Sequence, residues 1–168
     1  MIIGRGDIAS VLVDRPGRCY FAAGVSNSAE TRLSEFEREL CLLRAQLPHL
    51  RLVYFSSLSV FYADTPYTLH KLRMEAAVRE FFPCYTIVRL GNITWGDNPH
   101  TLINTLRARE ISGEPQVIHD VYRYVIDAAE LRHWLDMIPP WNCEMNITGR
   151  RMKVLDIYKE YVKWLQPA

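Results

Sequence analysis

Apolar runs and helical periodicities alternate along the chain. Short apolar runs typical of buried strands occupy residues 1–3, 19–25, 50–57, 84–92 and 143–148. Between them, apolar residues recur every three or four positions, which predicts helices at 28–47, 66–81, 101–110, 128–138 and 154–165. Strands that alternate with helices favour an α/β fold, in which a mainly parallel sheet is covered by helices on both faces.

Capping residues mark two of the predicted helix starts. Asn27, followed by Glu30 three positions later, is typical of a helix N-terminus, and Thr65 with Pro66 is a cap followed by a first-turn proline. Ligands of such folds bind at the carboxyl ends of the strands. We therefore expect the functional site where the predicted strands end.

Composition narrows the class of protein. With 168 residues, 49% of them apolar, and a net charge of +1, residues 1–168 are expected to form one compact domain. Basic residues are spread along the chain and matched by acids, which argues against a nucleic-acid partner. The four cysteines are isolated, and no apolar run reaches membrane-span length. We expect a cytoplasmic protein without metal or membrane partners.

A tyrosine and a lysine lie four positions apart just after two serines. Ser56 and Ser57 end a predicted strand, while Tyr67 and Lys71 are one turn apart on the following helix. A phenol, whose ordinary pKa is about 10, needs a nearby cation and a hydrogen-bond partner to transfer protons near neutrality. The alternative interpretation is an amphipathic pair on the helix surface and serines that merely cap a strand.

The glycines at the start of the chain follow a short strand. The pattern Gly4-x-Gly6-x-x-Ala9 is a form of the dinucleotide-binding fingerprint, in which glycines admit a pyrophosphate to a helix N-terminus. A full fingerprint is followed, about 20 residues later, by an acidic residue that holds the adenosine ribose. Asp14 is too close to Gly4 for that role.

Five segments resemble one known family, in the order expected of it. The segments are 52–61, 66–78, 85–96, 119–131 and 146–165. Together they resemble the short-chain dehydrogenases/reductases, in the extended branch of NAD-dependent epimerases and dehydratases that act on nucleotide sugars. The resemblance covers most of residues 50–165 and implies a minimal Rossmann-like three-layer sandwich with a sheet of about five strands.

The resemblance also implies roles for individual residues. Tyr67 would be the catalytic acid/base, Lys71 would stabilise its phenolate and hold the nicotinamide ribose, and Ser57 would bind the substrate oxygen. The residues expected to bind the cofactor, NAD or NADP, are Gly4, Arg5, Gly6, Ala9, Lys71, Leu90 and Asn92. Those expected to bind a nucleotide-sugar substrate are Ser57, Asn92 and Arg123, although Arg123 is nearly as well explained by a surface salt bridge.

The resemblance also bears on Arg89, on His70 and on the pair Leu58-Ser59. Arg89 matches the family segment that touches nicotinamide and substrate, and His70 is expected to face solvent. Dehydratases of the branch carry an Asp-Glu pair after the catalytic Ser/Thr, whereas this chain has Leu58-Ser59. Dehydration is therefore disfavoured.

The front of the chain departs from the family pattern. The segment 19–28 resembles the fourth strand of the family, so the second and third strands with their helices are missing, and the adenine pocket with them. Two hypotheses remain open. The first is an NAD(P)-dependent oxidoreductase or epimerase. The second is a non-catalytic nucleotide-binding or protein-interaction scaffold derived from that family.

The predicted helices 28–47 and 66–81 resemble those that form a four-helix dimer interface in the family. We therefore expect a homodimer. The alternative is that their apolar residues pack only on their own sheet. The residues concerned are Leu33, Leu40, Leu43, Met74 and Val78.

Overall fold

A five-stranded parallel sheet forms the centre of the molecule. The computed structural model describes residues 1–163. The strand order is β1-β2-β3-β4-β7, and every neighbouring pair is parallel. The strands are β1 (Ile2–Ile3), β2 (Arg18–Phe21), β3 (Arg51–Ser57), β4 (Tyr85–Leu90) and β7 (Cys143–Ile147). The predicted mainly parallel sheet of about five strands is confirmed.

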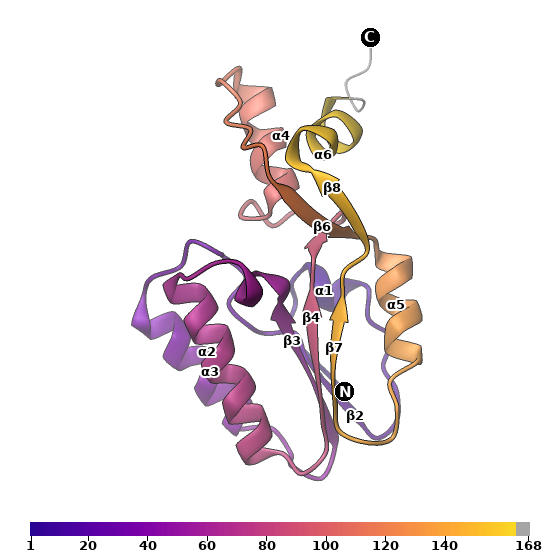
Figure 1. Cartoon of the computed structure of the whole chain (residues 1–168). Coiled ribbons are helices and arrows are strands. Elements are labelled where there is room, and N and C mark those ends of the chain that lie inside the picture. The colour runs from indigo at the N-terminus through magenta and orange to yellow at the C-terminus, as the bar shows by residue number, and fades with distance from the viewer. Residues whose placement is uncertain (164–168) are drawn as a thin grey trace.

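Helices cover both faces of this sheet (Figure 1). One face is packed by α2 (Leu33–Arg44) and α3 (Pro66–Phe81), and the other by the single turn α1 (Asp7–Ser10) and by α5 (Ala128–Asp136). Side chains of β3 alternate between the two interfaces: Leu52 and Tyr54 face α2 and α3, while the next residue after each faces the other layer. The result is the predicted three-layer α/β sandwich.

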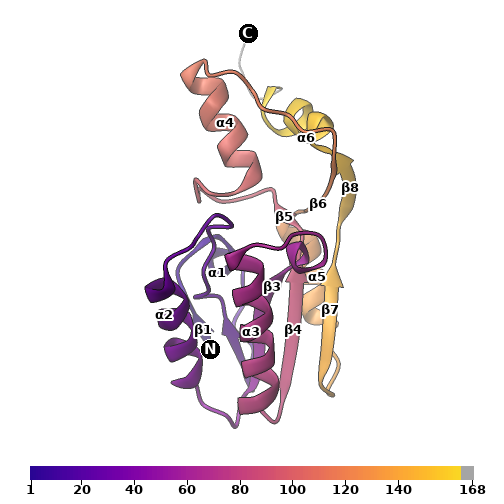
Figure 2. The same ribbon diagram turned by 60° about the vertical axis from the view of Figure 1, so that its left-hand side comes forward.

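A small lobe lies beyond the carboxyl end of the central sheet (Figures 1 and 2). It contains the short strands β5 (Asn92–Ile93), β6 (Tyr122–Ile126) and β8 (Arg150–Lys153), with β6 central and antiparallel to β8. The helices α4 (Leu102–Ser112) and α6 (Val154–Tyr161) pack on this sheet through a small apolar cluster. This second sheet was not predicted, because β6 and β8 contain arginine and lysine and so do not form the apolar runs that marked the central strands.

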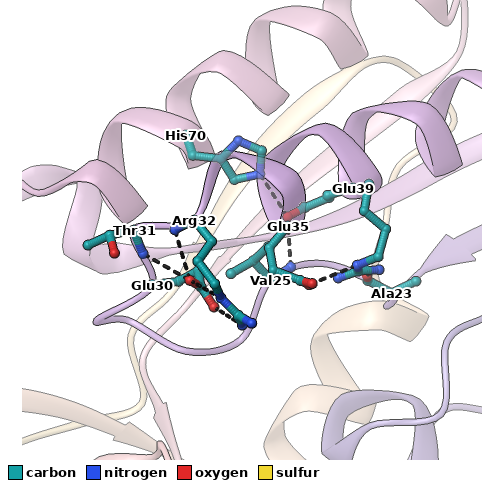
Figure 3. A network of polar contacts seen from close by, with 9 residues as sticks. Ala23, Val25, Glu30, Thr31, Arg32, Glu35, Glu39 and His70 are labelled. Atoms are coloured by element: carbon teal, nitrogen blue, oxygen red, sulfur yellow. Dashed lines mark hydrogen bonds and ion pairs between the residues drawn. The ribbon is translucent and has the colours of Figure 1, made fainter.

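One predicted helix start is wrong. Helix α2 begins at Leu33, not at residue 28. The side chain of Asn27 instead accepts the backbone N–H of Ala29. The carboxylate of Glu30 accepts the backbone N–H groups of Thr31 and Arg32 (Figure 3). These local bonds stabilise a turn that competes with the helix.

The second predicted start is confirmed. Helix α3 begins at Pro66, and the hydroxyl of Thr65 accepts the backbone N–H of Thr68, 3.2 Å away. The Thr68 hydroxyl in turn accepts the backbone N–H of Thr65, which completes a capping box. The cap fixes the entry angle of the helix that carries Tyr67 and Lys71.

The apolar residues of α2 and α3 are used mostly by their own sheet. Leu43, Met74 and Val78 are fully buried against it, whereas Leu33 is 68% exposed. The structure therefore accounts for most of the predicted dimer face within one chain. The homodimer stays a prediction.

Within residues 1–163, no helix is long and apolar enough to cross a membrane. In the same part of the chain, no group of three or more His, Cys, Asp or Glu side chains is placed to hold a metal ion.

Candidate active site

A cavity of about 980 Å³ opens at the carboxyl end of the central sheet, between the sheet and the small lobe. This is where ligands of parallel α/β folds bind. Nearly all the predicted site residues line it. They are Gly4, Arg5, Gly6, Ser57, Tyr67, Lys71, Leu90, Asn92 and Arg123. Ala9 is the exception, because it lies within α1 and not on the cavity wall.

Lys71 is held by a buried carboxylate that the sequence analysis missed. Its Nζ donates to Oε1 of Glu39 at 3.1 Å and to the hydroxyl of Tyr54 at 3.2 Å. The Tyr54 hydroxyl itself donates to the same carboxylate oxygen at 2.8 Å. All three side chains are buried, and they come from three different elements: α2, α3 and β3.

The second oxygen of Glu39 holds two further groups (Figure 3). Nε2 of His70 lies 2.9 Å from Oε2, and the backbone N–H of Val25 donates to it at 2.7 Å. The His70 ring stacks on Phe36, with centroids 4.4 Å apart. The prediction that His70 faces solvent is therefore wrong, because the ring is buried between α2 and α3.

The surroundings of Glu39 favour its charged form. Burial alone would raise the pKa of the Glu39 carboxyl, but the Lys71 ammonium and the bonds from His70, Val25 and Tyr54 outweigh it. The pKa of Glu39 is held well below its usual range. Burial, followed by the adjacent carboxylate, raises the pKa of the Tyr54 phenol well above its usual value, so Tyr54 stays a neutral donor.

Tyr67 is close to Lys71 without being bonded to it. The Lys71 Nζ lies 5.7 Å from the centroid of the Tyr67 ring. Among residues 1–163, no group forms a hydrogen bond with the Tyr67 hydroxyl. The phenol is 8% exposed and lines the cavity, so its hydroxyl remains available to a ligand.

The two serines at the end of β3 differ in their partners. Ser57 caps the short 3₁₀ helix η1 (Leu58–Phe61), and its hydroxyl lies 3.1 Å from the Ser59 N–H and 2.8 Å from the Ser59 hydroxyl. The Ser56 hydroxyl is buried and has no partner within the described residues. A buried hydroxyl without a partner is costly, and because Ser56 also lines the cavity, a bound molecule there could supply the bond.

The residues at the end of β4 and just after it have two separate tasks. Leu90 and Asn92 line the cavity, and the Asn92 amide donates to the Tyr124 carbonyl at 3.0 Å. Arg89 instead points away from the cavity into a buried ion pair with Glu75, where its Nε lies 2.8 Å from Oε1. The expected contact of Arg89 with nicotinamide and substrate is therefore wrong, because its charge is already paired in the core.

Arg123 is free to meet an anion. Its guanidinium lies over the Tyr62 ring, 5.2 Å from the centroid, and donates to the Tyr122 carbonyl. Within the described range, no carboxylate pairs with it, which removes the salt-bridge alternative for this part of the chain. Arg5, exposed on the glycine loop, likewise has no carboxylate partner among residues 1–163.

The two glycines of the fingerprint differ in how strictly the backbone requires glycine at their positions. Gly4 has a φ of +123°, and a Cβ there would lie 2.4 Å from the Ala22 carbonyl oxygen, so the fold itself requires glycine. A Cβ on Gly6 would meet no atom within 4 Å. The helix that follows is the single turn α1, whose Asp7 carboxylate accepts the backbone N–H groups of Asp97 and Asn98.

This difference predicts a large loss of stability for one of two matched substitutions and a small change for the other. Gly4→Ala should destabilise the protein by about 1–3 kcal/mol, because alanine is strained at that φ and its Cβ clashes with the Ala22 carbonyl just after β2. Gly6→Ala should change stability by less than about 0.5 kcal/mol, because its Cβ enters open space. Urea denaturation of both variants measures the difference. Equal losses would contradict the steric assignment.

A dinucleotide fits this site only in part. The open space at Gly6 fits a pyrophosphate, and the unpartnered Ser56 hydroxyl with the cavity-lining Tyr67 and Lys71 fits the nicotinamide end. The adenosine end has no counterpart in residues 1–163, because β1 is the edge of the sheet and no acidic residue ends a strand beyond it.

Comparison with solved structures finds similar folds in one class of enzymes. WbmG of Bordetella bronchiseptica, solved with NAD and UDP, matches with a TM-score of 0.68 and 14% identity, over 91% of this chain and 60% of that one. UDP-glucose 4-epimerase of Thermotoga maritima, solved with UDP-glucose, gives 0.62 and 16%, over 86% and 59%. dTDP-glucose 4,6-dehydratase of Bacillus anthracis, solved with NAD, gives 0.61 and 16%, over 84% and 56%.

No protein-family model matches the sequence, and no curated protein matches it. The chain spans about three fifths of the length of the solved structures it resembles. Those structures account for nearly all of the architecture described above, including the parallel sheet and its helical layers. The chain therefore has the fold of the NAD-dependent nucleotide-sugar epimerases and dehydratases, in a shortened form.

Proposed function

We propose that the cavity carries out NAD(P)-dependent oxidoreductase or epimerase chemistry on a nucleotide sugar, with Tyr67 as the acid/base. The observation that carries this proposal is the convergence of Ser57, Tyr67 and Lys71 with the glycine loop on one cavity. Solved proteins of the same fold bind NAD, UDP and UDP-glucose. The sequence segments that resemble the family contribute residues to the same cavity, and this supports a single site.

Within this proposal, each residue has a task that its contacts allow. Tyr67 exchanges the proton of a substrate hydroxyl, since its own hydroxyl has no partner in the described part of the chain. Lys71 has three N–H groups, two of which are bonded, so one remains for a ligand hydroxyl. Bound NAD(P) would supply the acceptance and return of hydride.

Two guanidiniums make the cavity suited to a diphosphate. Arg5 lies on the glycine loop and Arg123 on β6, so they approach the cavity from the sheet and from the small lobe. A guanidinium binds phosphate oxygens through paired N–H groups. Because neither is neutralised by a carboxylate among residues 1–163, both are available to a nucleotide diphosphate.

Titration of the protein with NAD, NADH, NADP and NADPH tests the proposal. We expect saturable binding with a dissociation constant in the micromolar range, about −8 kcal/mol, measured by tryptophan and nicotinamide fluorescence. A parallel titration with UDP should weaken roughly tenfold in Arg123→Gln if that guanidinium binds the diphosphate. Arg132→Gln is the matched control, because Arg132 is exposed on α5 and does not line the cavity. An absence of cofactor binding at millimolar concentration would contradict the proposal.

A second candidate is a non-catalytic nucleotide-binding or protein-interaction scaffold derived from the same family. The observation that favours it is the pairing of Lys71 with Glu39. The carboxylate neutralises the positive charge of Lys71, which a tyrosine acid/base needs nearby. The absence of an adenosine pocket in the described residues favours it as well. Binding of UDP without any hydride transfer would support this candidate over the first.

A further inference from the structure

We propose that Glu39 is the positioning residue of this site, the counterion that keeps Lys71 charged and fixed at the cavity wall. Neither the family resemblance nor the comparisons assign a role to Glu39. The inference rests on the proposed function only in its last step, which concerns turnover.

The contacts of Glu39 use its full hydrogen-bonding capacity. Each carboxylate oxygen accepts two bonds, from Lys71 and Tyr54 at Oε1 and from His70 and Val25 at Oε2. An ionised carboxylate has about four lone-pair sites, so none is left for solvent. The side chain is fully buried, and a charge this deep is retained only when it is paired and bonded.

The neighbouring loop is shaped around this ion pair. A Cβ on Gly24 would lie 2.7 Å from Oε1 of Glu39 and 2.8 Å from Nζ of Lys71. The chain after β2 therefore passes directly over the pair, and only glycine leaves room for it. The next residue, Val25, binds the carboxylate through its backbone N–H.

Among residues 1–163, Glu39 is the carboxylate paired with Lys71. The titratable groups in contact with Lys71 are Glu39 from α2, Tyr54 from β3 and Tyr67 from α3, while His70 of α3 is bonded to the other oxygen of Glu39. Glu75, one turn further along α3, is already paired with Arg89. Glu39 is thus the anion that compensates the buried ammonium, and removing it leaves a cation in a site that disfavours charge.

This arrangement separates two tasks that a single free lysine would combine. The two bonds to Glu39 and Tyr54 fix the direction of the ammonium, and the third N–H is left for a ligand in the cavity. Lys71 therefore acts on a ligand as an oriented donor, and it does so only while it stays protonated.

Glu39→Gln tests the inference through the charge of Lys71. The chain has four lysines, so ¹³Cε NMR of labelled lysine resolves each titration, and the signal absent from Lys71→Met identifies Lys71. We expect the acid dissociation constant of the Lys71 ammonium to be larger by roughly tenfold or more in Glu39→Gln than in the wild type. Glu37→Gln, an exposed position on the same helix, should leave the titration unchanged. An unchanged Lys71 titration in folded Glu39→Gln overturns the proposal.

The double variant Glu39→Gln/Lys71→Met decides the case in which Glu39→Gln does not fold. Recovery of a cooperative unfolding transition in the double variant supports the proposal, because it removes the uncompensated ammonium. A double variant that stays unfolded overturns it, since Glu39 would then serve the fold irrespective of Lys71. The NMR titration needs no turnover, so an inactive wild type in which Lys71 still depends on Glu39 contradicts the proposed function alone.

Discussion

Tyr67→Phe should lower turnover by roughly 10²–10⁴-fold, the contribution typical of a positioned acid/base, while the protein stays folded. The phenol hydroxyl makes no hydrogen bond within residues 1–163, so its removal costs the fold no bond among them. The ring keeps its packing against Lys71, 5.7 Å away. A hydride-transfer assay at saturating substrate measures the rate, and a thermal melt measures the fold.

Tyr85→Phe is the matched control for this substitution. Tyr85 begins β4, at the opposite end of the strand from the cavity. Loss of its hydroxyl should leave the rate unchanged. If Tyr67→Phe turned over as fast as the wild type, Tyr67 would not be the acid/base, and the scaffold interpretation would gain support.

Glu75→Gln should destabilise the protein by about 3–5 kcal/mol, the range measured when one partner of a buried ion pair is removed. Glu75 is fully buried and holds Arg89 through both carboxylate oxygens. Arg89 also pairs with Glu144 at 2.7 Å. Arg79, nearer the surface, pairs with both Glu75 and Glu144. Removing the central charge leaves the buried guanidinium with the partly exposed Glu144 as its carboxylate partner among residues 1–163, and with a long bond to the Asn146 side chain.

Urea denaturation measures this loss as a shift of the midpoint at constant slope. Glu80→Gln is the control, because Glu80 is exposed on the same helix and should change stability by less than about 0.5 kcal/mol. A similarly small change in Glu75→Gln would show that the Arg89 network contributes little to the fold. Since Glu75 does not line the cavity, folded Glu75→Gln should retain ligand binding.

The elements of the central sheet could be predicted because their signals are local. Five apolar runs and their intervening helices, together with the Thr65-Pro66 cap, are properties of neighbouring residues. The cap predicted at Asn27 failed for an equally local reason. Glu30 bonds to the backbone of Thr31 and Arg32 in a turn, and that competition cannot be decided from residue types alone.

The residues that line the candidate site could be predicted from the sequence, but their hydrogen-bond and ion-pair partners could not. Ser57, Tyr67 and Lys71 do line one cavity with the glycine loop, as the topology of a parallel sheet implies. Glu39 was missed, although a signal existed. It lies on the buried stripe of α2, three residues after Phe36 and four before Leu43, where an acid needs a buried partner.

The sequence by itself determined the order of the five central strands and of the helices between them, the cap of α3 and the polar residues that gather where the strands end. Only the tertiary structure decided which partner each charged group has. Lys71 pairs with Glu39, 32 positions earlier, because α2 and α3 pack side by side on one face of the sheet. Arg89 pairs with Glu75, because its side chain leaves β4 on that same face. A local pattern reports which residues will be buried, whereas burial of a charge is compensated by whichever partner the packing of distant elements places against it.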